Sequence, residues 1–302
     1  MAKPRQQASA PAERDRLEDI KKLVVIAMFS DDELMQHLVL KGGNLLDLVQ
    51  KISTRASADV DFSMEQDFPE GQEAFRNRIE RALQTTFREE GYAVFDVKMA
   101  EKPEQITEDV RGFWGGYGIE FKIIENAKYE ELSGDIDALR RNAIRLGQGQ
   151  KFLIDISRFE YVANKERRDF EGYVIFVYSA SMMVCEKLRA ICQQMLEYGP
   201  VIKRKRPGTP RARDFVDLHA LVSTLKVDVS SNDTQFLLKH IFAAKRVPLS
   251  LLGLISGHRE FHRADFPAVE ATVKAGVKLE PFDFYFDYVL GLVQELESFW
   301  NV

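Results

Sequence analysis

Cysteine is scarce in this sequence, and long hydrophobic runs are lacking. The 302 residues include two cysteines, Cys185 and Cys192, seven positions apart in a stretch with a helical pattern. That spacing separates them by about 10 Å along a helix axis, which excludes a disulfide between them. No apolar run approaches the roughly 18 residues of a membrane span, and the polar N-terminus lacks the apolar region of a secretory signal. We therefore expect a cytoplasmic protein without a membrane partner.

A general excess of basic residues is also lacking. The formal net charge is −5, so bulk attraction cannot hold a nucleic acid, and a local basic patch would have to do so. The segment Lys203 to Arg213 offers such a patch, with six Lys or Arg residues in eleven positions. Runs of this kind are most often solvated loops. The contents of 45% hydrophobic and 29% charged residues are those of a globular protein.

The hydrophobic pattern divides the chain into two parts and predicts an α+β fold. Residues 1–177 are expected to form an α/β lobe with a mixed sheet, and residues 178–302 a helical lobe; residues 1–12 are expected to be disordered. Whether 133–145 is helix or loop stays open. The remaining expected elements follow the apolar periodicity: helices at 11–30, 33–39, 70–90, 179–198, 214–225, 234–244, 266–274 and 285–300, and strands at 58–64, 92–99, 113–124 and 151–161.

Two carboxylates, Asp59 and Asp61, lie in the predicted strand at 58–64. Alternate residues of a strand point to the same face, so both carboxylates project together, about 6–7 Å apart at Cα. Such a pair repels unless a cation lies between its members. Mg²⁺ takes oxygen ligands and fills its remaining positions with water and substrate phosphates. A short Asp-x-Asp pattern alone occurs frequently in solvated edge strands. The surrounding residues must therefore indicate whether this pair binds a metal.

A glycine turn precedes the carboxylate pair by about fifteen residues. Lys41-Gly42-Gly43-Asn44 is followed by an apolar-periodic segment that predicts a helix. Glycines let the backbone approach a phosphate closely, and a helix N-terminus offers unpaired N–H groups. The Asn44 side chain is placed to cap the helix or to contact the phosphate. A phosphate site beside a metal site is therefore the hypothesis that explains both features together.

These segments resemble the AbiEii/AbiGii toxin nucleotidyltransferases, which belong to the polymerase-β-like superfamily. The similarity begins with Lys41-Gly-Gly-Asn44 and continues with Arg55, Ser57, Asp59 and Asp61-Phe-Ser63, although Asn44 stands where the family usually has Thr or Ser. Val184-Cys-Glu-Lys-Leu-Arg-Ala190 is similar to the helix that carries the family's nucleotide-contacting lysine, here Lys187. The segment from Arg211 to His219 is similar to an element that places Arg213, Asp214 and Asp217 at the nucleotide.

The resemblance also implies a third carboxylate, on a neighbouring strand, that assists deprotonation of the attacking hydroxyl. Asp155 is our choice, and Glu120 is the alternative. The expected catalytic set is Asp59, Asp61, Asp155 and Lys187, with the metal held by the three aspartates. The expected nucleotide-binding set is Lys41, Gly42, Gly43, Asn44, Arg55, Ser57, Lys187, Arg213, Asp214 and Asp217.

The function that the resemblance implies is transfer of a nucleoside monophosphate from an NTP to an acceptor hydroxyl, with Mg²⁺, or alternatively Mn²⁺, as cofactor. The protein would be the toxin of a toxin–antitoxin or phage-defence system, with a tRNA 3′ end as acceptor and a cognate antitoxin as partner. Two alternatives stay open. One is an enzyme that nucleotidylates or phosphorylates protein, and the other is a non-catalytic nucleotide-binding sensor. The sequence does not distinguish RNA from protein acceptors because the metal chemistry is the same.

Overall fold

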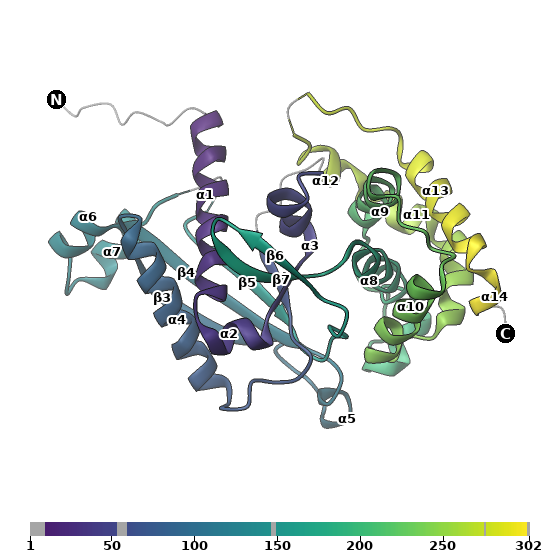
Figure 1. Ribbon diagram of the computed structural model, residues 1–302, viewed down its shortest axis with the longest axis horizontal. Coiled ribbons are helices and arrows are strands. Elements are labelled where there is room, and N and C mark those ends of the chain that lie inside the picture. The colour runs from purple at the N-terminus through teal and green to yellow at the C-terminus, as the bar shows by residue number, and fades with distance from the viewer. Residues whose placement is uncertain (1–9, 53–58, 146–148, 275, 301–302) are drawn as a thin grey trace.

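The computed structural model describes residues 10–52, 59–145, 149–274 and 276–300. Of the residues expected to bind nucleotide, Arg55 and Ser57 lie outside these ranges. The predicted α+β class is confirmed, since a mixed sheet occupies the N-terminal part of the chain and the elements described after Val177 are helical. Figure 1 shows the sheet with its covering helices on the left and the helices that follow it on the right.

Seven described strands form the sheet, in the order β3-β4-β5-β2-β1-β7-β6. β2 runs parallel to β5 and β1 parallel to β7, while the other neighbouring pairs are antiparallel. The two short strands β1 and β2 therefore lie inside the sheet, where both of their neighbours hold them. The strands are β1 (Val39–Lys41), β2 (Val60–Ser63), β3 (Tyr92–Lys102), β4 (Gly116–Glu125), β5 (Phe152–Ser157), β6 (Glu166–Phe170) and β7 (Tyr173–Val177).

The hairpin formed by β6 and β7 was not expected from the sequence. Phe170 pairs with Tyr173 across a two-residue loop, and both loop residues, Glu171 and Gly172, have positive φ angles of 50° and 84°. Positive φ at both positions is typical of the type I′ turn that matches the twist of a hairpin. β6 escapes prediction because four of its five residues are charged, so no apolar alternation marks it.

Helices α1 (Ala10–Phe29), α2 (Asp32–His37) and α4 (Gln72–Glu89) cover the sheet. α4 agrees with the predicted helix at 70–90, and Gly91 follows it with a φ of 84°, as expected beyond a helix C-terminus. α1 starts earlier than expected: residues 10–12 were predicted to be disordered, but they form its first turn, where alanine favours helix and proline is tolerated.

Three short helices lie near the outer strands: α5 (Glu108–Arg111), α6 (Asn126–Glu131) and α7 (Ile136–Asn142). α7 settles the segment 133–145, which the sequence left open. The Asp135 carboxylate caps it by accepting hydrogen bonds from the N–H groups of Asp137 at 3.0 Å and Ala138 at 2.9 Å.

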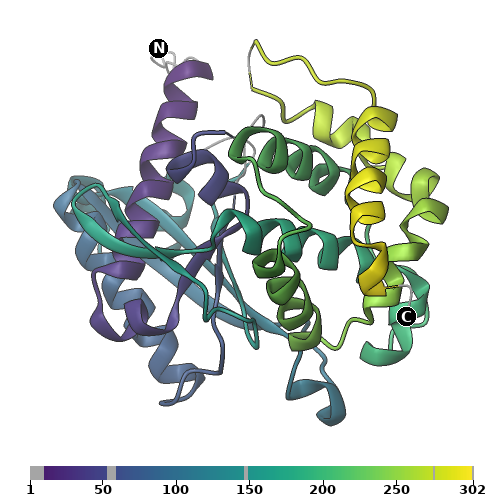
Figure 2. The same cartoon turned by 45° about the vertical axis from the view of Figure 1, so that its right-hand side comes forward.

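The helical part is arranged around α8 (Ala180–Cys192), which contacts α9 and α10 and lies closest to the sheet (Figure 2). α8 ends earlier than predicted and is followed by a separate 3₁₀ helix, η2 (Leu196–Ile202). A second 3₁₀ helix, η3 (Leu249–His258), was not expected, and the helix expected at 266–274 is the shorter α12. Both cysteines are buried in α8. The other helices are α9 (Ala212–Leu225), α10 (Asn232–Ala244), α11 (Arg259–Arg263), α12 (Phe266–Glu270), α13 (Phe282–Glu295) and α14 (Glu297–Trp300).

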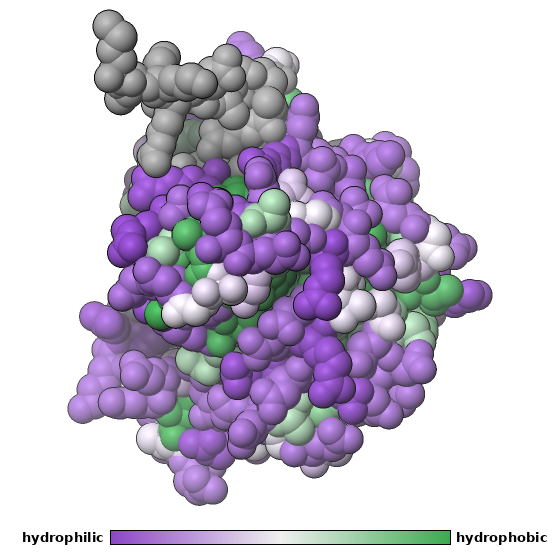
Figure 3. All heavy atoms as spheres, turned by 90° about the vertical axis from the view of Figure 1, so that its left-hand side faces the viewer, coloured by the Kyte–Doolittle hydropathy of each residue, from purple (hydrophilic) through white to green (hydrophobic). Residues whose placement is uncertain are grey.

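Among the described helices, none combines the length and the apolar character needed to cross a bilayer. On the face shown in Figure 3, hydrophobic residues form short patches between hydrophilic ones.

Candidate active site

Three carboxylates lie near one another where β2 runs beside β5. Asp61 is directly opposite Asp155 in the parallel pairing of these strands, and on the other side Asp61 is opposite Lys41 of β1. Residues in register on neighbouring strands point to the same face of a sheet. Asp59 precedes Asp61 by two positions. All four residues line a cleft of about 470 Å³ between the sheet and the helical part.

The carboxylates of this cluster make one another harder to ionise. Burial raises the pKa of Asp59, and the negative charge of Asp155 raises it further. Burial also raises the pKa of Asp61 to about 6, with Lys41 opposing the shift and Asp155 adding to it. A cation placed among carboxyl groups with raised pKa values stabilises their ionised form. An all-oxygen donor set is also the one that Mg²⁺ and Mn²⁺ prefer.

A lysine occupies part of this environment. The Lys102 ammonium group, at the end of β3, forms an ion pair with the Asp155 carboxylate. Within the described ranges, no group of three His, Cys, Asp or Glu side chains is gathered closely enough to hold a metal ion as it stands. The donor chemistry fits a divalent cation, and binding one by all three carboxylates requires Asp155 to exchange Lys102 for the metal.

The glycine turn lies against the carboxylates. Gly42 has a φ of 72°, and a Cβ there would lie 3.0 Å from the Asp61 Cβ. Gly42 and Gly43 both line the cleft. Asn44, expected to cap the helix or contact phosphate, makes no capping bond and has an exposed fraction of 0%. Its amide nitrogen donates to the backbone oxygen of Asp59 instead. Asn44 therefore helps to hold the backbone of the residue that directly precedes β2.

The opposite wall of the cleft is basic and comes from α8 and α9. Lys187 and Arg213 line it, as does Asp214. The Lys187 ammonium group lies 3.2 Å from Asp214 and 2.7 Å from Asp217. Asp217 is buried and is not among the described residues that line the cleft, and its carboxylate pairs with Lys187, which lines it.

Arg211 adds a further cation to this wall, because it lines the cleft and pairs with Asp214. Burial would raise the pKa of Asp214, but Arg211 and Lys187 outweigh burial and hold it well below its usual range. Asp214 is therefore ionised at any physiological pH. Its charge keeps the two cations directed toward the cleft.

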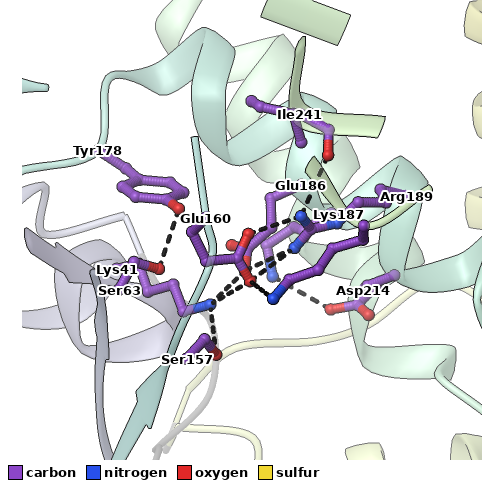
Figure 4. Close-up of polar contacts among 12 residues, drawn as sticks. Lys41, Ser63, Ser157, Glu160, Tyr178, Glu186, Lys187, Arg189, Asp214 and Ile241 are labelled. Carbon is purple, nitrogen blue, oxygen red and sulfur yellow. Dashed lines mark hydrogen bonds and ion pairs between the residues drawn. The ribbon is translucent and has the colours of Figure 1, made fainter. Parts of the chain in front are cut away.

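A buried network of charges joins the sheet to the helical part (Figure 4). Lys41 of β1 donates to Glu186 of α8 at 2.6 Å and lies 3.8 Å from Glu160, which follows β5. Arg189 of α8 donates two hydrogen bonds to Glu160, at 2.6 and 3.1 Å. Lys245, directly after α10, lies 3.6 Å from Glu160. The pKa of Glu160 is held well below its usual range, because Arg189 and Lys245 outweigh the effect of burial.

Several cleft residues were not found from the sequence. Four of them, Glu186, Arg189, Ala190 and Arg211, stand inside the segments that carry the family resemblance, so those segments held a signal for them. Glu160 and Lys245 reach the cleft only through the tertiary fold. The other cleft residues not found are Lys102, Pro103, Trp114, Gly115, Gly116, Tyr117, Ile156, Ser157 and Gln193.

The basic segment 203–213 divides into two parts. The Arg204 guanidinium is directed inward and donates to the backbone oxygens of Gln193 at 2.7 Å and Met195 at 3.0 Å. Lys203, Lys205 and Arg206 are exposed. The segment therefore borders the cleft as a structured loop with a basic outer surface.

The structure also distinguishes the two candidates for the third carboxylate. Glu120 of β4 lies opposite Leu153 of β5 and pairs with Lys151 at 2.6 Å. It is absent from the cleft lining, whereas Asp155 lies in the lining opposite Asp61.

Comparison with known proteins agrees with this geometry. The family model described as "Nucleotidyl transferase AbiEii toxin, Type IV TA system" matches residues 24–288. The fold is similar to that of MenT4, a nucleotidyltransferase toxin from Mycobacterium tuberculosis, with a TM-score of 0.52 and 14% identity over 97% of this chain and 87% of that one. It is also similar to JHP933 from Helicobacter pylori, with a TM-score of 0.50 and 15% identity over 98% and 95% of the two chains. No curated protein matches the chain by sequence.

Proposed function

This chain belongs to the nucleotidyl transferase AbiEii toxin family of type IV toxin–antitoxin systems, and we propose that it transfers a nucleoside monophosphate from an NTP to the 3′ end of a tRNA. Pyrophosphate leaves as the acceptor oxygen bonds to the α-phosphorus. The observation that carries the proposal is the row formed by Lys41, Asp61 and Asp155 across three strands, facing a basic wall on α8 and α9.

Asp59, Asp61 and Asp155 are the residues that would hold Mg²⁺ or Mn²⁺. A bound divalent ion would neutralise charge on the triphosphate and align the reacting oxygens. Asp155 has a second role as the carboxylate that accepts the proton of the attacking hydroxyl. A divalent ion held by Asp155 would compete with the Lys102 ammonium group, which would then be available to the substrate phosphates.

The phosphates would be held from both sides of the cleft. Backbone N–H groups at Gly42 and Gly43, which line the cleft, would approach the phosphates from the sheet side. Lys187 and Arg213, with Arg211 beside them, approach from the helical side. Such charge-assisted contacts are strong in a partly buried site. Arg55 and Ser57, in the segment outside the described residues, retain their proposed part in nucleotide binding.

An RNA acceptor is supported by the exposed side chains of Lys203, Lys205 and Arg206 beside the cleft. Contacts of these side chains with RNA phosphates would be salt-dependent and independent of sequence. Membership of a type IV toxin–antitoxin family implies an antitoxin as the protein partner. We place the reaction in the cytoplasm, together with its NTP and its RNA acceptor.

The test is incubation of the protein with each α-³²P-labelled NTP, Mg²⁺ and either total tRNA or a cell lysate. The matched control is the double variant Asp59→Asn and Asp61→Asn, which keeps side-chain size and removes both charges. Label in tRNA that the control does not produce supports the proposal. Label in protein supports protein nucleotidylation instead. Measurable NTP binding without transfer from any nucleotide would favour a non-catalytic sensor.

A further inference from the structure

Trp114 gives the cleft an aromatic wall that the proposed chemistry does not use. It lies in the loop between α5 and β4, is half-buried and lines the same cleft as the carboxylates. Tyr117 is the other aromatic residue among the described cleft-lining residues. Its ring is covered by the Arg158 guanidinium at 4.6 Å, and its hydroxyl donates to Asp67 at 2.7 Å. Trp114 is therefore the ring that can receive a ligand.

The backbone around Trp114 is held on both sides. Its N–H donates to the oxygen of Val110 at 3.1 Å, and the oxygen of Gly115 accepts from the N–H of Arg158 at 3.0 Å. A Cβ on Gly115 would lie 2.6 Å from Ile106, and one on Gly116 would overlap the backbone oxygen of Ile156. The absence of a side chain at both glycines lets the backbone that follows Trp114 pack closely against Ile106 and against Ile156 of β5.

Two residues of the helical part lie beside the Trp114 ring, and one of them, Lys245, also lines the cleft. The Tyr198 ring lies 5.9 Å from the Trp114 ring, centroid to centroid, and the Lys245 ammonium group lies 5.8 Å from the Trp114 centroid. Lys245 is anchored in turn by the backbone oxygen of Phe113 at 3.4 Å. Within the part of the chain that the structure describes, the indole N–H has no hydrogen-bond acceptor. A rigid ring with a free donor at the edge of a cleft is suited to a planar polar ligand.

The position of Trp114 relative to the carboxylates fits a nucleotide. Gly118 lies opposite Asp155, and Trp114 precedes Gly118 by four residues, a separation of at most about 14 Å for an extended chain. Ribose and phosphates can span that distance. We propose that Trp114 is a stacking platform for a nucleobase, either that of the NTP or that of the acceptor's terminal nucleotide. This subsite rests on the proposed nucleotidyl transfer, and its test is independent of turnover.

The chain has two tryptophans, which makes the test direct. Trp300 lies in α14, where its N–H donates to the oxygen of Val293 at 3.0 Å, away from the cleft lining. In the Trp300→Phe variant, tryptophan fluorescence reports on Trp114 alone. The probes are Mg²⁺ with each NTP, Mg²⁺ with inorganic tripolyphosphate, which has no base, and a short single-stranded oligoribonucleotide. We expect quenching by a base-containing probe and none by tripolyphosphate.

Affinity is then compared for Trp114→Leu and Trp114→Phe in the same background, with thermal unfolding as the check on folding. Loss of one base-stacking contact weakens binding by about 5- to 150-fold. We expect this for Trp114→Leu with the base-containing probe, a smaller loss for Trp114→Phe, and unchanged tripolyphosphate binding in both. A loss confined to the NTP assigns the platform to the donor base, and a loss confined to the oligoribonucleotide assigns it to the acceptor base.

Unchanged affinity of Trp114→Leu for every base-containing probe would overturn the proposal, as would equal weakening of tripolyphosphate binding. These outcomes are separable from failure of the proposed function. Base-dependent quenching without transfer of label would refute nucleotidyl transfer and leave the stacking site standing. Transfer of label with kcat and KM unchanged in Trp114→Leu would support nucleotidyl transfer and refute the stacking site.

Discussion

Gly42 and Asp61 lie so close together that a side chain on the glycine would occupy the space of the aspartate carboxylate. Gly42 also has a φ of 72°, a conformation that costs other residues about 1–2 kcal/mol. Glycine is therefore required at position 42 for two reasons, the positive φ angle and the close approach of Asp61 from β2.

Gly42→Ala is expected to reduce transfer by about 100-fold or more, because displacement of a reacting group by even 1 Å has that effect. Gly134→Ala is the matched control, since Gly134 also has a positive φ, of 99°, but a Cβ added there would meet no atom within 4 Å. Thermal unfolding should show a larger loss of stability for Gly42→Ala, because only its added Cβ meets a neighbouring side chain. Equal activity of the two would show that the contact with Asp61 has no role.

Asp155→Asn is expected to lower kcat by about 100-fold or more, the range of general-base catalysis. Glu120→Gln should remain within about twofold of the parent activity, because Glu120 pairs with Lys151 outside the cleft. Steady-state transfer assays on the two variants decide between these carboxylates. The reverse ranking would move the third carboxylate to β4.

Lys102→Gln is expected to tighten metal binding in the absence of nucleotide. Mg²⁺ or Mn²⁺ must displace the Lys102 ammonium group from Asp155, and an exposed ion pair of this kind is worth up to about 1 kcal/mol. Mn²⁺ titration followed by electron paramagnetic resonance should show up to about fivefold higher affinity. Lys98→Gln, on the same strand and paired with Asp96, is the control. Weaker Mn²⁺ binding by Lys102→Gln would contradict the exchange of Lys102 for metal.

Asp61→Asn is expected to stabilise the metal-free protein at alkaline pH. The Asp61 pKa is raised from 3.8 to about 6, so the folded state binds this proton more tightly than the unfolded state does. The stabilisation by that proton is complete below pH 3.8 and is lost as the pH rises through 6, a total of about 3 kcal/mol.

Thermal unfolding with a chelator should therefore show the variant more stable than the parent at pH 8, with the difference disappearing near pH 4. Added Mg²⁺ should stabilise the parent more than the variant at pH 8. A parent protein whose stability relative to Asp61→Asn does not change with pH would contradict the raised pKa.

Local patterns predicted the strands that carry Asp61 and Asp155, because strand alternation and a glycine turn are readable over a few residues. Asp59, which was predicted inside the first of these strands, lies directly before it. They did not reveal Glu160 or Lys245, which meet across 85 positions of sequence with no periodic signal. The Asn44 side chain was expected, from its place in the turn, either to cap the following helix or to contact phosphate. Its burial and its hydrogen bond to the backbone oxygen of Asp59 depend on the packing of β2, which no local pattern encodes.

Trp114 illustrates an intermediate case. The sequence placed it in the expected strand at 113–124, whereas β4 begins at Gly116, and only the fold shows that the start of β4 lies against β5. The hairpin of β6 and β7 was missed for a different reason: an edge strand rich in Glu and Arg has the composition of a loop.

The buried network of Lys41, Glu160, Glu186, Arg189 and Lys245 is expected to make the whole chain unfold in one transition. Calorimetric and van't Hoff enthalpies should then agree. Glu160→Ala should lower stability by about 3–5 kcal/mol, because it leaves buried cations without a counter-charge. Two separate thermal transitions would contradict this coupling.

The same network decides whether the chain can be divided. A cut near residue 178 falls between the last strand and α8, but it would leave Glu160 on one fragment and Arg189 on the other. Each fragment would expose charged side chains whose ion-pair partners lie on the other fragment. The two fragments should therefore be poorly folded apart and should reassemble when mixed, with an affinity that falls as salt is raised.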